Sequence, residues 1–337
     1  MIRSALVALF AGLFLWTASA SGENPAATLY DRETLAYWGE RYARTSNRIL
    51  HEGLFPELDL QEYKALGSVE LAFPPRGDDL IGFYAAWPPP KIVLPVVSLK
   101  LLDDLSIAYA WLWAKGYSFE TVDAYVAMLR YKPLAAFPGG RYPSPFEALG
   151  IPANAIDDPQ VDDMSLRFFN SARAFILAHE LAHILYKHEG RGPQVLQDEI
   201  AADRFALDLL ARAGNVPMGI ILYFQAMAHW SPNRAQFRSD AAWKAFIAEH
   251  RTHPLSAERI TRIAQALDEL APAFAKYDPT SEADTALVRD IASSLSVLVD
   301  YLDDGEMQLC VGEAAAKAEV ADLAPRRAGT SFLDCGD

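Results

Sequence analysis

Cysteine and basic residues are both scarce in this chain, and each shortage argues against a class of protein. Only Cys310 and Cys335 are present, both near the C-terminus, so a cysteine-ligated zinc site or a cysteine nucleophile is not expected. In an oxidising compartment these two cysteines could pair and tie down the tail. Lys and Arg total 30 against 44 acidic residues, and the net charge of −14 argues against nucleic acid and anionic membranes as partners.

Long hydrophobic runs are also lacking after the first twenty residues. Residues 1–20 have the order of a secretory signal: Arg3 is the positive start, 5–16 the apolar stretch, and Ala18-Ser19-Ala20 a small-x-small cleavage site. The apolar stretch is short for a bilayer span, and an uncleaved N-terminal anchor is the alternative. We therefore expect an exported protein, periplasmic or secreted, with no integral membrane segment after cleavage.

The remaining chain has the composition of a globular protein without internal repeats. It has 337 residues in all, of which 51% are hydrophobic, enough to bury a full core. Apolar spacing predicts helices over 34–51, 99–115, about 163 or 165 to before Gly190, 194–213, 218–230, 241–250, 256–270 and 285–302. No feature of the sequence specifies an oligomeric state.

Short apolar runs between proline clusters predict a small antiparallel sheet. They cover 69–73, 80–87 and 91–97, and the last two form a predicted hairpin. The Pro-, Gly- and Asp-rich stretch 132–165 is predicted to be a long loop, either a cleft wall or a plain connector. The predicted fold class is α+β, mostly α. The predicted segments are a signal peptide (1–20), an N-terminal helical segment (21–67), a catalytic domain (68–270) and a C-terminal helix and tail (271–337).

The run His179-Glu180-Leu181-Ala182-His183 reads H-E-x-x-H inside an otherwise apolar stretch, 174–186. On a helix, positions i and i+4 share one face, so both imidazoles can grip one zinc ion, with Glu180 beside it as a base. The alternative is a chance match. Chance matches fall mostly in loops or on solvated helices, because isolated charges on a buried helix are costly.

A catalytic zinc uses three protein ligands, and the third is predicted on the next helix. Glu199 and Asp203 are spaced i and i+4 on an otherwise apolar face. Glu199 could complete a two-His, one-Glu site, and Asp203 could accept a hydrogen bond from the outer nitrogen of a ligand histidine. The alternative is a solvated acidic edge paired with Arg204.

Other histidines are weaker candidates for this site. His188 is a rival third ligand, but its spacing does not share the face of the two motif histidines, so it is predicted to be a surface residue. His51, His229 and His250 have no partner pattern.

His253-Pro254 with Arg259 forms a third segment of interest. Pro254 fits a helix start, which would let His253 point into a cleft and stabilise an oxyanion. Arg259 could pair with Asp203 and hold it in place. A helix cap is the alternative interpretation of this segment.

Together these motifs resemble zinc metallopeptidases of the gluzincin type, and more specifically the M48 family. That family carries H-E-x-x-H, then E-x-x-A-D, then H-P followed by Arg, all of which this chain has between residues 179 and 259. The resemblance implies a zincin-like fold with His179, His183 and Glu199 as zinc ligands. The hairpin-to-helix run 82–102 resembles the family's substrate-binding edge strand, with Pro88-Pro89-Pro90 in place of its usual glycines.

The resemblance also implies roles for the other motif residues. Glu180 would be the general base, Asp203 the partner of a ligand histidine, His253 the transition-state stabiliser and Arg259 its structural support. The gap between His183 and Glu199 is shorter than is common in M48 proteins, and it is similar to that of the IrrE-like and phage-exclusion metallopeptidases.

The predicted function is that of a zinc-dependent endopeptidase acting on exported polypeptides. Zinc-activated water would be the nucleophile and Glu180 the base that takes its proton. One alternative is a non-catalytic or self-inhibited zinc-binding chaperone or assembly factor on a peptidase scaffold, in which His253 or His188 fills the fourth metal position. Another is a zinc hydrolase that acts on something other than peptides.

Overall fold

The computed structural model describes residues 25–190, 192–232, 234–249, 253–275, 282–327 and 335. The predicted signal peptide and His250 lie outside these residues. The described part is mostly helical, as predicted, with helices α1 (Pro25–Thr28), α2 (Arg32–Arg48), α3 (Leu60–Leu66), α4 (Val96–Lys115), α5 (Glu120–Tyr131), α6 (Pro145–Leu149), α7 (Pro159–Tyr186), α8 (Val195–Ala213), α9 (Ile220–Trp230), α10 (Asp240–Glu249), α11 (Ala257–Phe274), α12 (Glu282–Asp303) and α13 (Gly305–Lys317).

The sheet is small and mixed rather than purely antiparallel. Its strands are β1 (Glu70–Ala72), β2 (Tyr84–Ala86) and β3 (Lys91–Val93), in the order β1-β3-β2. The predicted β2–β3 hairpin is confirmed, with Ala85 opposite Ile92. β1 instead runs parallel to β3, because a long connection returns the chain between them. β2 is therefore an edge strand among the described strands.

Helix α7 forms the centre of the fold because apolar residues surround it on all sides. Every residue from Ser171 to Ile184 is buried, so this part of the helix has no solvent face. The Asp158 side chain caps the start by accepting from the Gln160 N–H, and Pro159 occupies the first turn. The helix ends at Tyr186, where Lys187 adopts a left-handed conformation.

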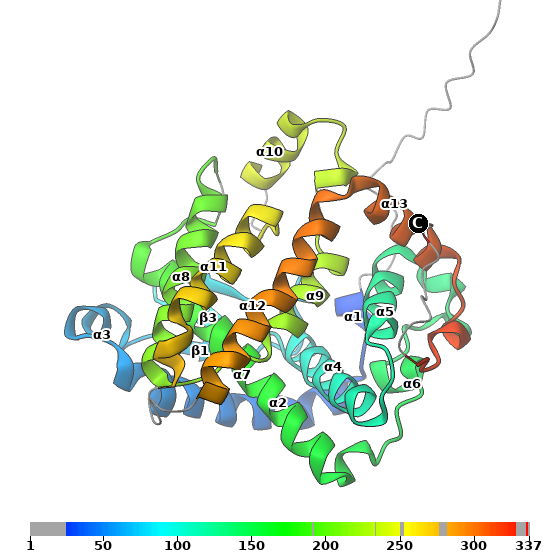
Figure 1. Ribbon diagram of the computed structural model, residues 1–337, viewed down its shortest axis with the longest axis horizontal. Helices are drawn as coiled ribbons and strands as arrows, with labels where there is room; N and C mark the ends of the chain where they lie inside the picture. Colours follow the sequence, from blue (N-terminus) through cyan, green and yellow to red (C-terminus); the bar gives the residue numbers. More distant parts are fainter. Residues whose placement is uncertain are drawn as a thin grey trace, which may run out of the picture.

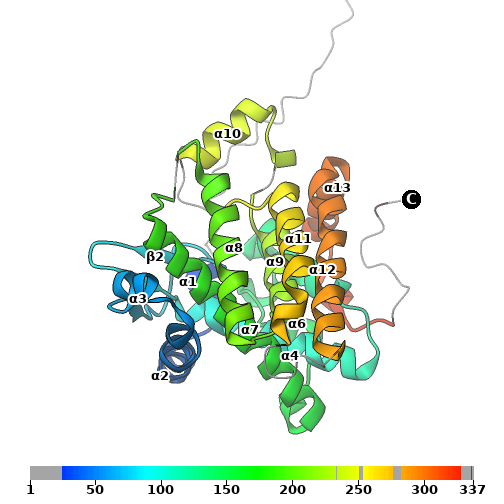
Figure 2. The same cartoon turned by 60° about the vertical axis from the view of Figure 1, so that its left-hand side comes forward.

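Helices α4, α8 and α9 pack against α7, and two further long helices extend this layer. α4 and α8 contact α7 directly, α11 packs on α8, and α12 packs on α11 (Figures 1 and 2). α9 approaches α7 very closely at Gly219, where an added Cβ would lie 1.9 Å from the Phe168 carbonyl oxygen. In both views α10 stands apart at one end of the helical body, while α2 lies toward the other end.

The stretch 132–165 is less irregular than predicted. It contains α6, whose N-cap Ser144 forms a reciprocal capping box with Glu147, and it contains the first turn of α7. The predicted segment boundaries at 67/68 and 270/271 remain predictions. α11 runs through residue 270, and one hydrophobic core includes residues from Ala26 to Leu323.

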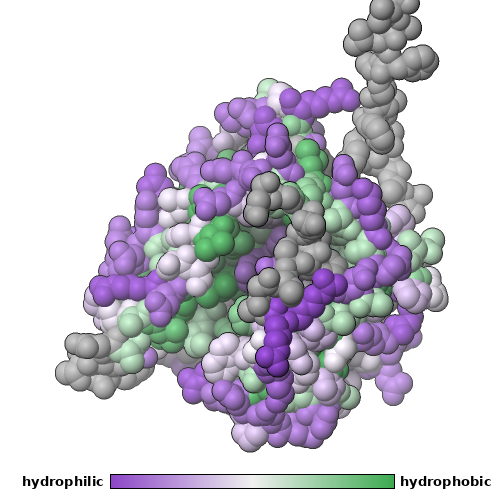
Figure 3. Space-filling view, turned by 45° about the vertical axis from the view of Figure 1, so that its right-hand side comes forward, coloured by the Kyte–Doolittle hydropathy of each residue, from purple (hydrophilic) through white to green (hydrophobic). Residues whose placement is uncertain are grey.

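The surface shown in Figure 3 mixes hydrophilic and apolar residues, and strongly apolar side chains gather left of its centre. Among the described helices, none combines the length and the hydrophobicity that crossing a bilayer requires. The disulfide that the two cysteines could form is present, and it joins Cys310 on α13 to Cys335 in the tail.

Candidate metal centre

Four side chains from α7, α8 and the start of the α11 segment converge on one point. His179, His183, Glu199 and His253 each offer one nitrogen or oxygen atom, and these atoms all lie within 4.8 Å of one another. The Nε2 atoms of His179 and His183 are 3.0 Å apart. The carboxylate of Glu199 lies 3.4 Å from the first of these nitrogens and 3.3 Å from the second. This arrangement could hold a metal ion.

His253 has both of its ring nitrogens engaged. Its Nδ1 atom lies 3.1 Å from each carboxylate oxygen of Glu199 and 3.4 Å from His179 Nε2. Its Nε2 atom lies 2.9 Å from the carbonyl oxygen of Phe83, the residue before the edge strand β2. With the proton on Nε2 donated to Phe83, the Nδ1 lone pair faces the other donors, as a fourth ligand requires.

The helix start predicted at Pro254 lies further along the chain. α11 begins at Ala257, and the Ser256 hydroxyl accepts from the Arg259 N–H as its N-cap. Residues 254–255 therefore lie outside the helix, in the segment that carries His253 to the donor cluster.

Asp203 and Arg259 lie directly behind the cluster. Asp203 Oδ1 is 2.9 Å from His179 Nδ1, the nitrogen that points away from the donors. The Arg259 guanidinium donates twice to the Asp203 carboxylate, at 2.6 and 2.8 Å, and its third nitrogen lies 2.9 Å from Glu199. All three side chains are buried. Such a fork fixes both carboxylates, because Arg presents its donors in a rigid plane.

His188 is not the free surface residue that the sequence predicted. Its Nδ1 atom is 3.0 Å from His183 Nδ1, and its Nε2 atom is 3.6 Å from Asp198 Oδ1. The left-handed turn at Lys187 reverses the chain after α7, so the His188 N–H bonds to the His183 carbonyl. The imidazole thus returns to the outer edge of the motif, which helical spacing alone does not show.

Glu180 lies beside the cluster with one oxygen unoccupied. The residue is 2% exposed, and its Oε2 atom has no hydrogen-bond partner among the described residues. Its Oε1 atom is 3.6 Å from His253 Nε2. A buried carboxylate oxygen without a partner is costly unless another group, such as water, uses it.

The charge of the site favours a divalent cation. Glu180, Glu199 and Asp203 are buried with Arg259 as their cationic partner, which leaves two net negative charges when the imidazoles are neutral. Burial by itself lowers the pKa of His179, but Asp203 and Glu199 outweigh it and raise that pKa to about 10. In the metal-free protein a proton therefore supplies positive charge that a divalent ion would otherwise supply.

Tyr223 on α9 lies close to this site, and the sequence offered no motif for it. The ring lies 6.4 Å from those of Phe83 and Phe175, and the Phe175 ring is 6.0 Å from that of His179. Burial raises the pKa of the phenol, with Glu180 and Glu199 adding to this effect, so the hydroxyl keeps its proton. That hydroxyl has no hydrogen-bond partner among the described residues, so it is an available donor.

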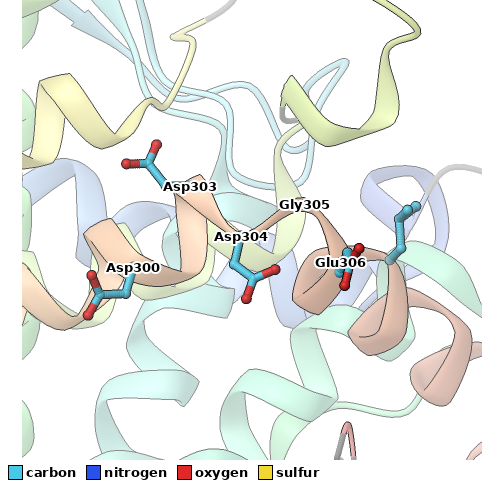
Figure 4. Close-up of a pocket in the computed structure, with 6 residues that line it drawn as sticks. Asp300, Asp303, Asp304, Gly305 and Glu306 are labelled. Carbon is cyan, nitrogen blue, oxygen red and sulfur yellow. The ribbon is translucent and has the colours of Figure 1, made fainter.

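The acidic residues at the α12–α13 junction do not form a comparable site. Figure 4 shows the carboxylates of Asp300, Asp303 and Asp304 pointing away from one another. They line an open hollow on the surface and do not converge on one point. Within the described residues the four-donor group is thus the metal-binding candidate.

Comparison with known proteins supports a peptidase. A family model described as Peptidase U49 matches residues 151–273, which include α7, α8, α9 and most of α11. All four donor residues, together with Glu180, Asp203 and Arg259, fall inside this match. No curated protein and no solved structure matches the chain.

Proposed function

We propose that this chain is a zinc-dependent endopeptidase with His179, His183 and Glu199 as metal ligands. The observation that carries the proposal is the convergence of these donors beside Glu180, inside the segment that matches a peptidase family. Two imidazoles and one carboxylate are a typical ligand set for catalytic zinc. Bound zinc would polarise a water molecule and lower its pKa toward neutrality.

Side chains of the protein would then accept and return the proton of this water molecule. Glu180 would accept it on the buried oxygen that has no described partner, and would later return it to the leaving amine. Asp203, held by Arg259, would keep the proton of His179 on Nδ1 and direct its Nε2 lone pair toward the donors. Assignment to the M48 family in particular remains part of this proposal.

The substrate would be a polypeptide in an extended conformation. β2 has an open edge among the described strands, and Phe83 at its start contacts His253. A peptide that adds to this edge as a further strand would run past Glu180. We place the protein outside the cytoplasm, in the periplasm or secreted. The signal-like residues 1–20 and the Cys310–Cys335 disulfide support this, since disulfides persist in oxidising compartments.

Replacing the base tests the catalytic proposal. Glu180→Gln should retain zinc, because Glu180 is not among the donors, and should lose cleavage of denatured exported proteins. The zinc-loaded wild type is the positive control, and the chelated wild type is the negative one. Proteolysis at the wild-type rate by Glu180→Gln, with zinc bound, would contradict the proposed role.

The position of His253 favours a second candidate, a self-inhibited or non-catalytic zinc protein. Four protein donors close a zinc site, whereas a catalytic zinc keeps one position open. His253 Nδ1 lies among the donors, so in this conformation it stands where water would bind. If the ring left the cluster, its Nε2 proton would be freed from Phe83 for an oxyanion.

Removing the His253 ring separates these possibilities. His253→Ala should raise the rate of peptide cleavage if the ring blocks the fourth position. It should lower kcat if the ring stabilises the oxyanion. Zinc binding without cleavage in both the wild type and His253→Ala would favour the non-catalytic protein. His51→Ala, which removes an exposed imidazole outside the donor cluster, is the matched control.

A further inference from the structure

His183 needs a hydrogen-bond acceptor that the motif itself does not supply. A neutral imidazole carries one N–H, so a histidine that offers its Nε2 lone pair must keep its proton on Nδ1. For His179, Asp203 Oδ1 stands 2.9 Å from that Nδ1. No carboxylate stands in the corresponding place for His183 among the described residues.

His188 occupies that place. Its Nδ1 atom lies 3.0 Å from His183 Nδ1, which suits an N–H donated by His183 to the His188 lone pair. The His188 proton is then on Nε2, which faces Asp198 Oδ1 at 3.6 Å. The side chain of His188 is 10% exposed and that of Asp198 is 24% exposed, so the chain of contacts runs from solvent to the donors.

The end of α7 places this imidazole. Lys187 has a φ of 57°, and this left-handed residue lets the His188 N–H reach the His183 carbonyl at 3.0 Å. The two rings meet edge to face, with centroids 5.0 Å apart. Both a backbone hydrogen bond and a ring contact therefore hold His188 against His183.

We propose that His188 is a positioning residue that holds His183 in the tautomer required for metal binding, supported in turn by Asp198. It does for His183 what Asp203 does for His179. The inference rests on the proposed metal site, but it concerns residues that the H-E-x-x-H and E-x-x-A-D patterns leave unassigned. His188 is not itself a ligand, because its Nδ1 is directed at His183 and it lies outside the donor group.

Zinc affinity of the full exported chain tests this role without relying on activity. His188→Leu removes the acceptor and should weaken zinc binding by about 10- to 100-fold, the usual effect of losing such a partner. His188→Asn should restore affinity close to that of the wild type, because Asn Oδ1 replaces the imidazole Nδ1 as acceptor. His51→Leu serves as a control for loss of an exposed imidazole.

The measurement is a competition between each protein and a chromophoric chelator for zinc, at one pH. Nitrogen NMR of the zinc-loaded proteins should show a protected Nδ1–H on His183 in the wild type and in His188→Asn, and its loss in His188→Leu. Equal melting temperatures of the metal-free variants would show that the fold is retained.

Two results would overturn the inference. One is wild-type affinity in His188→Leu, and the other is affinity in His188→Asn as weak as in His188→Leu with both proteins folded. A wild type that binds no zinc would instead overturn the proposed metal site, so the two failures are distinguishable.

Discussion

Replacing Arg259 by Met should destabilise the protein strongly, because it removes the guanidinium that pairs with two buried carboxylates. Arg259 is 1% exposed, donates twice to Asp203, and lies 2.9 Å from Glu199. Met fills a similar volume and retains packing near Phe224, over whose ring the guanidinium lies at 5.5 Å. The loss is therefore mainly electrostatic.

The expected magnitude follows from the burial of both carboxylates. Removing one partner of a buried ion pair costs about 3–5 kcal/mol, since the remaining charge is left uncompensated. Each kcal/mol lowers the melting temperature of a domain by about 2–4 °C, so the fall should be roughly 6–20 °C, toward the lower end for a chain of this length. Because Glu199 also loses its contact, the cost is not expected to fall below this range.

The loss of stability in Arg259→Met should increase as the pH rises. Burial alone would raise the pKa of Asp203, but Arg259 holds that pKa below its ordinary value. In the wild type this pair adds stability above the unfolded pKa, and the gain disappears as the pH falls through the folded pKa. Without Arg259, only His179 still opposes the effect of burial on Asp203, so the pKa of Asp203 should rise and the variant should lose further stability as pH rises.

Thermal melting with a chelator present measures this effect without differences in metal occupancy. The difference in melting temperature between the wild type and Arg259→Met should be larger at pH 8 than at pH 5. Arg259→Lys should fall between them, since Lys keeps the charge but lacks the planar fork. Arg262→Met, an exposed change on the same helix, is the control. A melting temperature within 2 °C of wild type at pH 8, roughly the effect of 1 kcal/mol, would refute the reasoning.

Two further residues give predictions that do not involve the metal ligands. Tyr223→Phe removes a buried hydroxyl whose ring packs on Phe83 and Phe175 beside the site, so kcat should fall by about tenfold or more while zinc affinity stays unchanged. An unaltered kcat would exclude the hydroxyl from the reaction. Burial raises the pKa of Asp123 to about 7 against the hydrogen bond from Tyr109, so this carboxyl costs stability as pH rises from about 4 to 7. Asp123→Asn should therefore melt at a higher temperature than the wild type at pH 8, and this increase should be smaller at pH 5. Calorimetry can measure both melting temperatures. An equal increase at the two pH values would argue against ionisation of Asp123 as the cause.

The mostly helical fold could be predicted because helix signals are local. The apolar run around H-E-x-x-H predicts a buried helix, and α7 is buried on all sides from Ser171 to Ile184. Gly214 ends α8 in the left-handed conformation, as its position after the apolar spacing indicated. The parallel pairing of β1 with β3 was not predictable in the same way, since strand partners are set by long-range packing.

For the candidate metal ligands, too, the local pairs could be predicted from the sequence, whereas the contacts between helices could not. Spacing of i and i+4 puts His179 with His183, and Glu199 with Asp203, on single helix faces, and only the backbone geometry of a helix is needed for this. The structure brings the two pairs together by packing α7 on α8, and it adds Arg259 from α11.

From the sequence alone, one can predict a buried helix that carries on one face side chains able to hold a metal ion. What surrounds that face depends on the tertiary structure. A single left-handed residue turned His188 back onto His183, and the chain before α11 placed His253 between Glu199 and the Phe83 carbonyl. Helical periodicity is a property of neighbouring residues, whereas these contacts depend on loop conformations that the whole core selects.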